Sequence, residues 1–298
     1  MTTAAAISRR RFLATLCAAT LAGTAPGLAQ PASLEGLRVA TPDWAIFETL
    51  LAIGANVVAA PELLGFADVA VTPKVPASVN DLGLRGTPNL ETLRLAAPGL
   101  IFNSNFYARL QDRLELIAPV ETHSVYVPDQ SPYPLAEAMT LALGERLGLA
   151  VGTQLVSKAQ ASFEASRQTL INDGHPAIMV NFGDARHLRV FGADSMFGEV
   201  LSRLGIDNAW SEATSYSAMA PVGIEILAGM PDVWIIVIAP TPADVAGMMQ
   251  TSAFWKALPS VKAGRVIQLG PVNPYGALPA AMRFADLLTE GYAHARRR

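Results

Sequence analysis

Short apolar runs alternate along the chain with longer segments whose apolar residues recur at helical spacing. The runs predict strands at Leu37–Thr41, Asn56–Ala60, Leu100–Asn103, Ile178–Phe182, Val233–Ala239 and Arg265–Leu269. Several are apolar throughout, which is typical of parallel strands covered on both faces. Helical spacing predicts helices at Ala45–Ile53, Leu90–Leu95, Pro134–Leu147, Met196–Leu204 and Pro279–Glu290. This alternation of strands and helices predicts an α/β fold with mainly parallel sheets flanked by helices.

The segment from Thr153 to Leu170 differs from the rest because it has no glycine or proline and only a loose apolar stripe. We interpret it as a long helix that joins two lobes. The expected division is an N-terminal lobe at 33–152, a connecting helix at 153–172 and a C-terminal lobe at 173–298. A surface crossover helix inside one domain is the alternative.

A weak internal repeat also favours two lobes. Glu91 precedes Pro98 and an apolar run, and Glu225 precedes Pro231 and a similar run. Each unit predicts an acidic residue at the start of a short helix, a proline turn and a buried strand. A glutamate near a helix start is also ordinary helix-dipole chemistry, so the repeat alone assigns no role.

The first 29 residues have the organisation of an export signal. Arg9, Arg10 and Arg11 precede Phe-Leu and an apolar stretch that is too short to span a bilayer. Small residues follow, and cleavage is expected after Ala29. Paired arginines before Phe-Leu favour the twin-arginine pathway. An amphipathic N-terminal helix is the alternative, and the residues before Cys17 fit a lipid-anchor site poorly.

Composition narrows the functional classes. Hydrophobic residues make up 51% of the 298-residue chain, which excludes a disordered chain. The sequence has no basic stripe, so nucleic acid is not expected as a partner. The net charge of −3 becomes more negative once the arginines of the leader are removed. The single cysteine, Cys17, leaves with the leader, so the mature chain is expected to have no disulfide, cysteine nucleophile or thiolate metal site.

The sequence contains none of the catalytic or metal-binding motifs that would indicate an enzyme. The sequence lacks a G-x-S-x-G elbow and a P-loop, and no G-x-G-x-x-G follows a predicted strand. The four histidines are scattered without ligand spacing, at positions 123, 175, 187 and 294. We therefore expect neither catalysis nor a metal held directly by side chains, although a metal can arrive inside an organic chelate.

Four segments carry a resemblance to a known family. They are Asp81–Glu91, Asp184–Ser195 with its continuation to Trp210, Trp255–Arg265 and Tyr275–Ala277. Together they resemble periplasmic ferric-hydroxamate siderophore-binding proteins of ABC importers, within the siderophore and cobalamin class. The resemblance extends from about residue 36 to the C-terminus. It implies two α/β lobes joined by one long rigid helix, with the ligand in a shallow cleft between them.

The resemblance also implies roles for single residues. Arg85 and Tyr107 match the arginine and tyrosine that contact hydroxamate oxygens around ferric iron. The resemblance further implies four aromatic residues that line the cleft: Trp44, Trp210, Tyr216 and Tyr275. Tryptophans of the family are replaced here by Asn103, Ser217 and Asn273, so the aromatic wall is thinner and more polar. We hypothesise that Asn103 and Asn273 bind a more polar siderophore backbone or a citrate-like arm.

Glu91 and Glu225 match the exposed acidic residue on each lobe that docks to arginines of the membrane permease. The sequence therefore predicts a monomeric periplasmic solute-binding protein, not an enzyme. Its ligand is an Fe(III)–siderophore chelate, no cofactor is covalently bound, and its partner is an inner-membrane ABC permease with its ATPase. Cobalamin, haem, a catecholate or a mixed citrate siderophore stays open as cargo, and a secreted α/β enzyme is the rival class.

Overall fold

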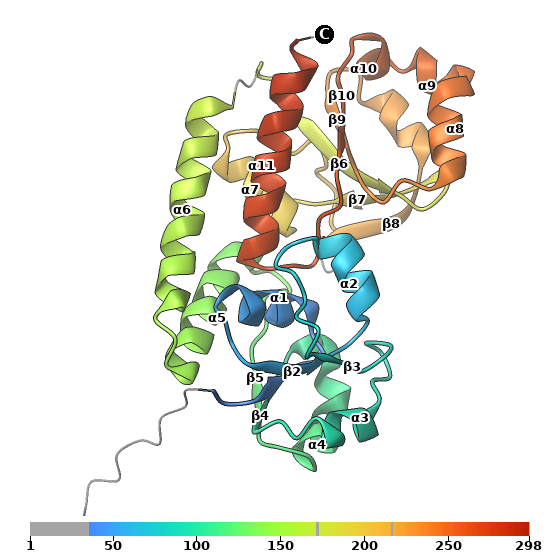
Figure 1. Ribbon diagram of the computed structural model, residues 1–298. Coiled ribbons are helices and arrows are strands. Elements are labelled where there is room, and N and C mark those ends of the chain that lie inside the picture. Colours follow the sequence, from blue (N-terminus) through green and yellow to red (C-terminus); the bar gives the residue numbers. More distant parts are fainter. Residues whose placement is uncertain (1–35, 171–172, 216, 298) are drawn as a thin grey trace, which may run out of the picture. The chain divides into compact units, whose positions relative to one another are not determined.

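The computed structural model describes residues 36–170, 173–215 and 217–297, and the expected export signal lies outside them (Figure 1). The first sheet has the order β3-β2-β1-β4-β5, and all its strands are parallel. Its strands are β1 Val39–Ala40, β2 Val57–Ala60, β3 Asn80–Asp81, β4 Leu100–Asn103 and β5 Val120–Thr122. We call residues 36–150, which contain this sheet, the N-terminal lobe.

The second sheet has the order β10-β9-β6-β7-β8 and belongs to the C-terminal lobe, residues 173–297. Its strands are β6 Ala177–Phe182, β7 His187–Phe191, β8 Ala218–Gly223, β9 Trp234–Ile238 and β10 Val266–Leu269. Strands β6, β9 and β10 are parallel, whereas β7 and β8 pair antiparallel. The predicted α/β class with mainly parallel sheets is therefore confirmed.

Every helix predicted from periodicity is present; Leu90–Leu95 has the predicted bounds, and the other four differ at one or both ends. The N-terminal lobe has α1 Trp44–Ala52, α2 Leu63–Ala70, α3 Leu90–Leu95, the 3-10 helix η1 Asn105–Leu110, α4 Gln111–Glu115 and α5 Pro132–Leu147. The C-terminal lobe has α7 Met196–Arg203, the 3-10 helix η2 Ile224–Gly229, α8 Ala243–Thr251, α9 Ala253–Ala257, α10 Pro259–Lys262 and α11 Leu278–Ala295. None of these described helices is long and apolar enough to cross a membrane.

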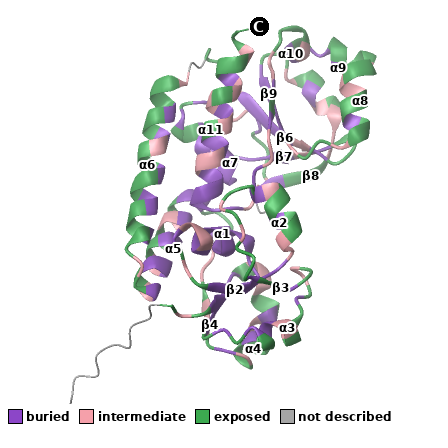
Figure 2. Ribbon diagram, in the orientation of Figure 1, coloured by how far each residue is buried: buried purple, intermediate pink, exposed green. Residues whose placement is uncertain are grey.

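Helix α6, Val151–Thr169, leads from the N-terminal lobe to β6 and packs against α5 and α11. One face is buried through Leu155, Ala159 and Phe163, while the opposite face is exposed along its length (Figure 2). The close approach of α5 to α6 depends on Gly144 and Gly152, because a Cβ on either would lie 3.0 Å from the other's Cα. The long polar helix predicted at the centre of the chain is thus present.

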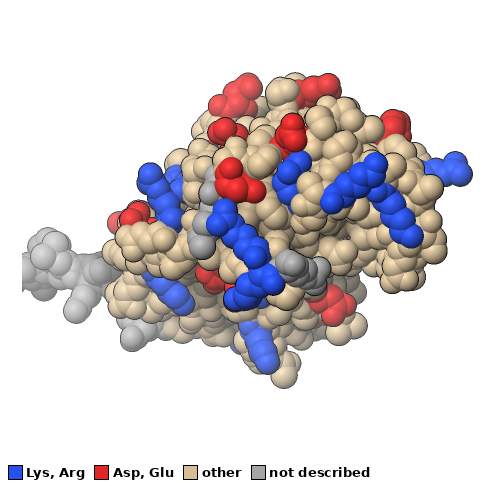
Figure 3. Space-filling model, turned by 90° about the horizontal axis from the view of Figure 1, so that it is seen from above, with Lys and Arg blue, Asp and Glu red and all other residues tan. Residues whose placement is uncertain are grey.

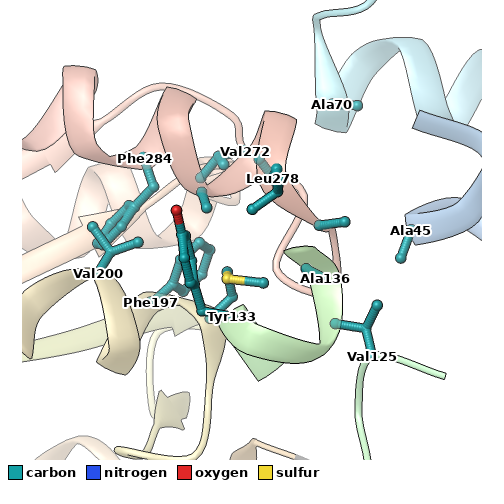
Figure 4. Close-up of a cluster of buried hydrophobic side chains, with 14 of the residues drawn as sticks. Ala45, Ala70, Val125, Tyr133, Ala136, Phe197, Val200, Val272, Leu278 and Phe284 are labelled. Atoms are coloured by element: carbon teal, nitrogen blue, oxygen red, sulfur yellow. The ribbon is translucent and has the colours of Figure 1, made fainter. Parts of the chain in front are cut away.

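A single hydrophobic cluster contains residues from both lobes (Figure 4). Ala45 and Val125 of the N-terminal lobe belong to the same cluster as Phe197 and Phe284 of the C-terminal lobe. The rings of Phe197 and Phe284 lie 4.4 Å apart between centroids, so α7 and α11 are in direct contact. Burial of this shared surface favours one arrangement of the two sheets. Basic and acidic side chains are both scattered over the face in Figure 3.

Candidate functional site

Asp81 organises the loop that carries Arg85. Its carboxylate accepts hydrogen bonds from the backbone N–H of Gly83 at 2.8 Å and of Leu63 at 3.1 Å. Gly83 has a φ of 71°, a left-handed conformation that glycine adopts without steric cost. These contacts explain why Asp-x-Gly precedes the arginine in the sequence motif, since they fix the turn from which Arg85 projects.

Arg85 lies on the face of Trp44. Its Cζ is 3.7 Å from the centroid of the indole ring, which is a cation–π contact. Trp44 is the first residue of α1, and the Asp43 carboxylate caps that helix by accepting from the N–H groups of Ala45 and Ile46. The indole Nε1 donates to the Pro61 carbonyl at 3.0 Å, so the ring that supports the guanidinium is itself held in place.

Glu62 is the acidic partner of this arginine. The Arg85 Nε donates to Glu62 Oε2 at 2.8 Å, and the Arg85 backbone N–H donates to Glu62 Oε1 at 3.0 Å. Both side chains are half-buried. The two terminal nitrogens of Arg85 donate to no described residue, and they are therefore able to donate to oxygen atoms of a ligand.

Tyr107 joins this group from η1. Burial, with a smaller contribution from the Asp43 carboxylate, raises the pKa of Tyr107 to about 12, while Arg85 acts in the opposite direction. The phenol therefore stays protonated at neutral pH and can donate a hydrogen bond. Arg85 lies on Trp44, and its charge acts on the Tyr107 hydroxyl, so these three residues, which sequence motifs singled out separately, lie in one part of the N-terminal lobe.

A pocket of about 520 Å³ is lined by both lobes. The N-terminal lobe contributes Tyr126 to Gln130, and the C-terminal lobe contributes Ala193, Asp194 and residues between Trp210 and Ser217. The Trp210 side chain is buried, and its indole N–H has no hydrogen-bond partner among the described residues. This pocket brings two of the predicted site residues, Trp210 and Ser217, to a surface shared by the lobes.

Ser217 donates two hydrogen bonds to Asp194. Its N–H donates to Asp194 Oδ2 at 3.1 Å, and its hydroxyl donates to the Asp194 carbonyl at 3.0 Å. The Thr214 hydroxyl donates to the other Asp194 oxygen. These bonds hold Ser217 at a φ of 78°. The predicted site residue Tyr216 lies outside the described residues.

Three aromatic residues connect the lobes beside this pocket. The hydroxyl of the buried Tyr126 donates to the Gly276 carbonyl at 2.7 Å. The rings of Tyr126 and Tyr275 are 5.5 Å apart in an edge-to-face arrangement, and Phe106 also meets Tyr275 edge-on. Burial raises the pKa of the half-buried Tyr275. Tyr275 thus contacts aromatic residues of the N-terminal lobe, whereas sequence motifs did not reveal Tyr126 and Phe106.

Asn103 and Asn273 are buried, and their amides bind neighbouring protein groups. The Asn103 Nδ2 donates to Gln111 at 3.0 Å and to the Tyr107 carbonyl at 3.3 Å. The Asn273 Oδ1 accepts from the Tyr275 N–H at 3.2 Å. In this structure both residues therefore position the tyrosines of the site, and their contacts give no support to the hypothesis that they bind a siderophore arm.

Glu48 is a fully buried carboxylate that sequence analysis missed. It accepts hydrogen bonds from Asn273 Nδ2 at 3.0 Å and from the N–H groups of Ala277 and Ala280 at the start of α11. Burial raises its pKa to about 7, and the nearby Asp43 carboxylate adds to the rise. Helix α1 of one lobe is thereby joined to α11 of the other.

Glu91 and Glu225 are exposed in the first turns of α3 and η2. Strands β4 and β9 follow these helices after a proline turn, as the internal repeat predicted. Glu91 pairs with the exposed Arg94 at 3.1 Å. No cluster of three or more His, Cys, Asp or Glu side chains in the described part of the chain could hold a metal ion.

Comparison with known proteins places this geometry in a family. Residues 39–272 match the periplasmic binding proteins. The chain belongs to the periplasmic binding protein family. The iron(3+)-hydroxamate-binding protein FhuD of Escherichia coli (strain K12) is 28% identical to it over 284 residues, which are 95% of either chain. The family resemblance that the sequence motifs carried is thus confirmed.

Solved structures of other binding proteins share the fold. The crystal structure of FhuD from Vibrio cholerae bound to Fe3+–Desferal aligns with a TM-score of 0.82 and 26% identity, covering 88% of this chain and 99% of that one. FeuA from Bacillus subtilis, complexed with ferri-bacillibactin, aligns with a TM-score of 0.69 and 12% identity, covering 88% and 94%. At that lower identity the likeness shows the fold alone.

Proposed function

We propose that this binding protein captures a ferric hydroxamate-type siderophore between its lobes and delivers it to an inner-membrane ABC permease. The observation that carries the proposal is the group formed by Arg85, Trp44 and Tyr107, in which the terminal nitrogens of Arg85 and the Tyr107 hydroxyl can donate to ligand oxygens. Similarity to FhuD over almost the whole chain supports the same cargo class. The leader supports export to the periplasm by the twin-arginine pathway, and the protein acts as a monomer.

Recognition follows from the donors at the site. The oxygens of a ferric hydroxamate centre carry negative charge, and the free terminal nitrogens of Arg85 can contact more than one of them. The protonated Tyr107 hydroxyl supplies a further donor. The siderophore itself satisfies the iron, so the protein contacts the outer surface of the chelate and needs no ligating side chain.

The site favours binding without covalent chemistry. The buried carboxylates of Asp43 and Glu48 accept hydrogen bonds from amide N–H groups, which leaves them poorly placed to act as general bases. The pocket is also lined by Asp129, Asp194 and Glu212, and the Asp194 carboxylate accepts hydrogen bonds from Thr214 and Ser217. We therefore assign the protein a transport role and no catalytic activity.

A fluorescence titration tests the proposed cargo. Trp44 and Trp210 lie at the site, so bound iron is expected to quench their emission. Purified mature protein is titrated with ferrichrome, a ferrioxamine, ferric enterobactin, haem and cobalamin. Saturable quenching by the hydroxamates, with weaker or no response to the others, supports the proposal. Response to cobalamin, haem or the catecholate alone, or to none of the five, refutes it.

Glu91 and Glu225 are assigned to permease docking. Both carboxylates are exposed at the start of short helices, where they can meet arginines of a membrane partner. The double variant Glu91→Gln/Glu225→Gln is expected to lower siderophore-dependent iron uptake while keeping ligand affinity. Glu145→Gln on α5, also exposed, serves as the matched control. Unchanged uptake by the double variant would remove this assignment.

A further inference from the structure

Arg189 carries a positive charge that no acidic side chain of the described residues pairs with, unlike the charge of Arg85. Arg85 is paired with Glu62 at 2.8 Å, and Arg109 donates to the Gly86 carbonyl at 2.7 Å. Arg189 is half-buried, yet no hydrogen bond or ion pair joins its guanidinium to another described residue. A partly desolvated cation without a counter-ion is costly, and a bound anion relieves that cost.

Arg189 lies on the face of the sheet that also carries Phe191, which belongs to the hydrophobic cluster with residues from both lobes. It lies on β7 between Leu188 and Val190, which both face the second hydrophobic cluster of the C-terminal lobe. Because side chains alternate across a strand, Arg189 is on the other face of the sheet. It pairs there with Asn181 of β6, whose amide is already bonded to the Ile238 carbonyl at 2.8 Å.

Arg189 is close to the lobe junction, because Phe191, two residues further along β7, pairs with Ala218, which follows the pocket-lining Ser217. Its charge acts on the hydroxyl of Tyr275 and opposes the rise that burial causes in the pKa of this tyrosine. Tyr275 in turn contacts Tyr126 and Phe106 of the N-terminal lobe. The Asp194 carboxylate also acts on Tyr275, and it accepts hydrogen bonds from Thr214 and Ser217.

We propose that Arg189 determines specificity by pairing with a carboxylate on the siderophore, so that the preferred cargo is a ferric hydroxamate bearing an anionic arm. This inference rests on the proposed function. The iron centre binds Arg85 and Tyr107 of the N-terminal lobe, while the anionic arm binds Arg189 of the C-terminal lobe. A ligand with a cationic tail at the same place is repelled.

Three ferrioxamines that share one iron centre isolate the effect of the arm. Ferrioxamine B ends in a protonated amine, its N-acetyl derivative is neutral, and its N-succinyl derivative ends in a carboxylate. The wild-type protein is expected to bind the succinyl form most tightly and the amine form most weakly. Because the arginine is only half-buried, this preference should decrease as salt is added.

The variant Arg189→Gln is expected to lose about tenfold in affinity for the succinyl form, the size of one charge-assisted hydrogen bond, and less for the acetyl form. Arg113→Gln removes the same charge from the exposed face of α4 and should keep the wild-type order. Circular dichroism checks that both variants fold.

The outcomes separate the two levels of the proposal. If the wild-type protein binds all three ferrioxamines with equal affinity, the role of Arg189 is refuted and the proposed function stands. The same order of affinities in wild type and Arg189→Gln also refutes it. Failure of all three ferrioxamines and of ferrichrome to bind refutes the proposed function and this inference together.

Discussion

The variant Glu48→Gln makes the ionisation of a buried carboxylate measurable as a change in stability. The folded-state pKa of Glu48 is about 7, whereas its ordinary value is 4.5. The folded protein therefore holds this proton more firmly than the unfolded chain does. The stabilising effect of the neutral form is complete below pH 4.5 and is lost as the pH rises through 7.

The size of the effect follows from the difference between the two pKa values. At about 1.4 kcal/mol for each pH unit, the shift from 4.5 to about 7 corresponds to about 3 kcal/mol of unfolding free energy. Glutamine cannot ionise, so the variant lacks this dependence. It also turns an NH2 group toward the Asn273 amide, which costs about 1–3 kcal/mol at every pH.

Urea unfolding followed by tryptophan fluorescence at pH 4.5, 6, 7 and 8 measures both proteins. The stability advantage of wild type over Glu48→Gln is expected to shrink by about 3 kcal/mol between pH 4.5 and pH 8. Asp43 and the other acids occur in both proteins and cancel in the difference. The exposed Glu145→Gln should show no such trend. A constant difference across the pH range would refute the role assigned to Glu48.

Three further substitutions test other contacts. Tyr107→Phe removes the phenolic donor and should weaken binding of a ferric hydroxamate about tenfold in a fluorescence titration; unchanged affinity would contradict its assignment. Gly198→Ala would push a methyl group into the Gly192 carbonyl oxygen, so urea unfolding should show a loss of about 1–3 kcal/mol; a stable variant would mean that the turn before α7 can move. Tyr126→Phe leaves the Gly276 carbonyl without its donor and should cost about 1 kcal/mol in the same assay, and full stability would show that water replaces the hydroxyl.

Most strands predicted from sequence are buried along their length, such as β9, because a continuous apolar run identifies them, whereas β10 was predicted although its Gln268 is exposed. The β7–β8 pair was missed, since on β7 the exposed His187 and half-buried Arg189 alternate with buried Leu188 and Val190. This pattern belongs to a sheet face that is only partly covered. The same polar alternation concealed Arg189 as a candidate for ligand binding.

The site was predictable where a local motif carries it and unpredictable where distant segments make it. Arg85 follows a turn built by residues within the motif Asp81–Glu91. The hydrogen-bond donors to Glu48 lie about 225 residues further along the chain, and the sequence around Glu48 contains no motif that indicates them. The burial of Asn273 has the same origin, because its amide is covered only when α1 and α11 meet.

The hydrogen bonds between Glu48 and the start of α11 can form only late in the synthesis of the chain. At about 5–20 residues per second, the 225 residues that separate Glu48 from Asn273 take about 10–45 s to synthesise. During that time helix α1 lacks the groups that cover its carboxylate, and Phe284 is missing from the shared hydrophobic cluster. A chain released before residue 278 therefore cannot complete its fold. Full-length protein and truncated products thus differ in whether α11 is present to cover Glu48 and fill the shared hydrophobic cluster.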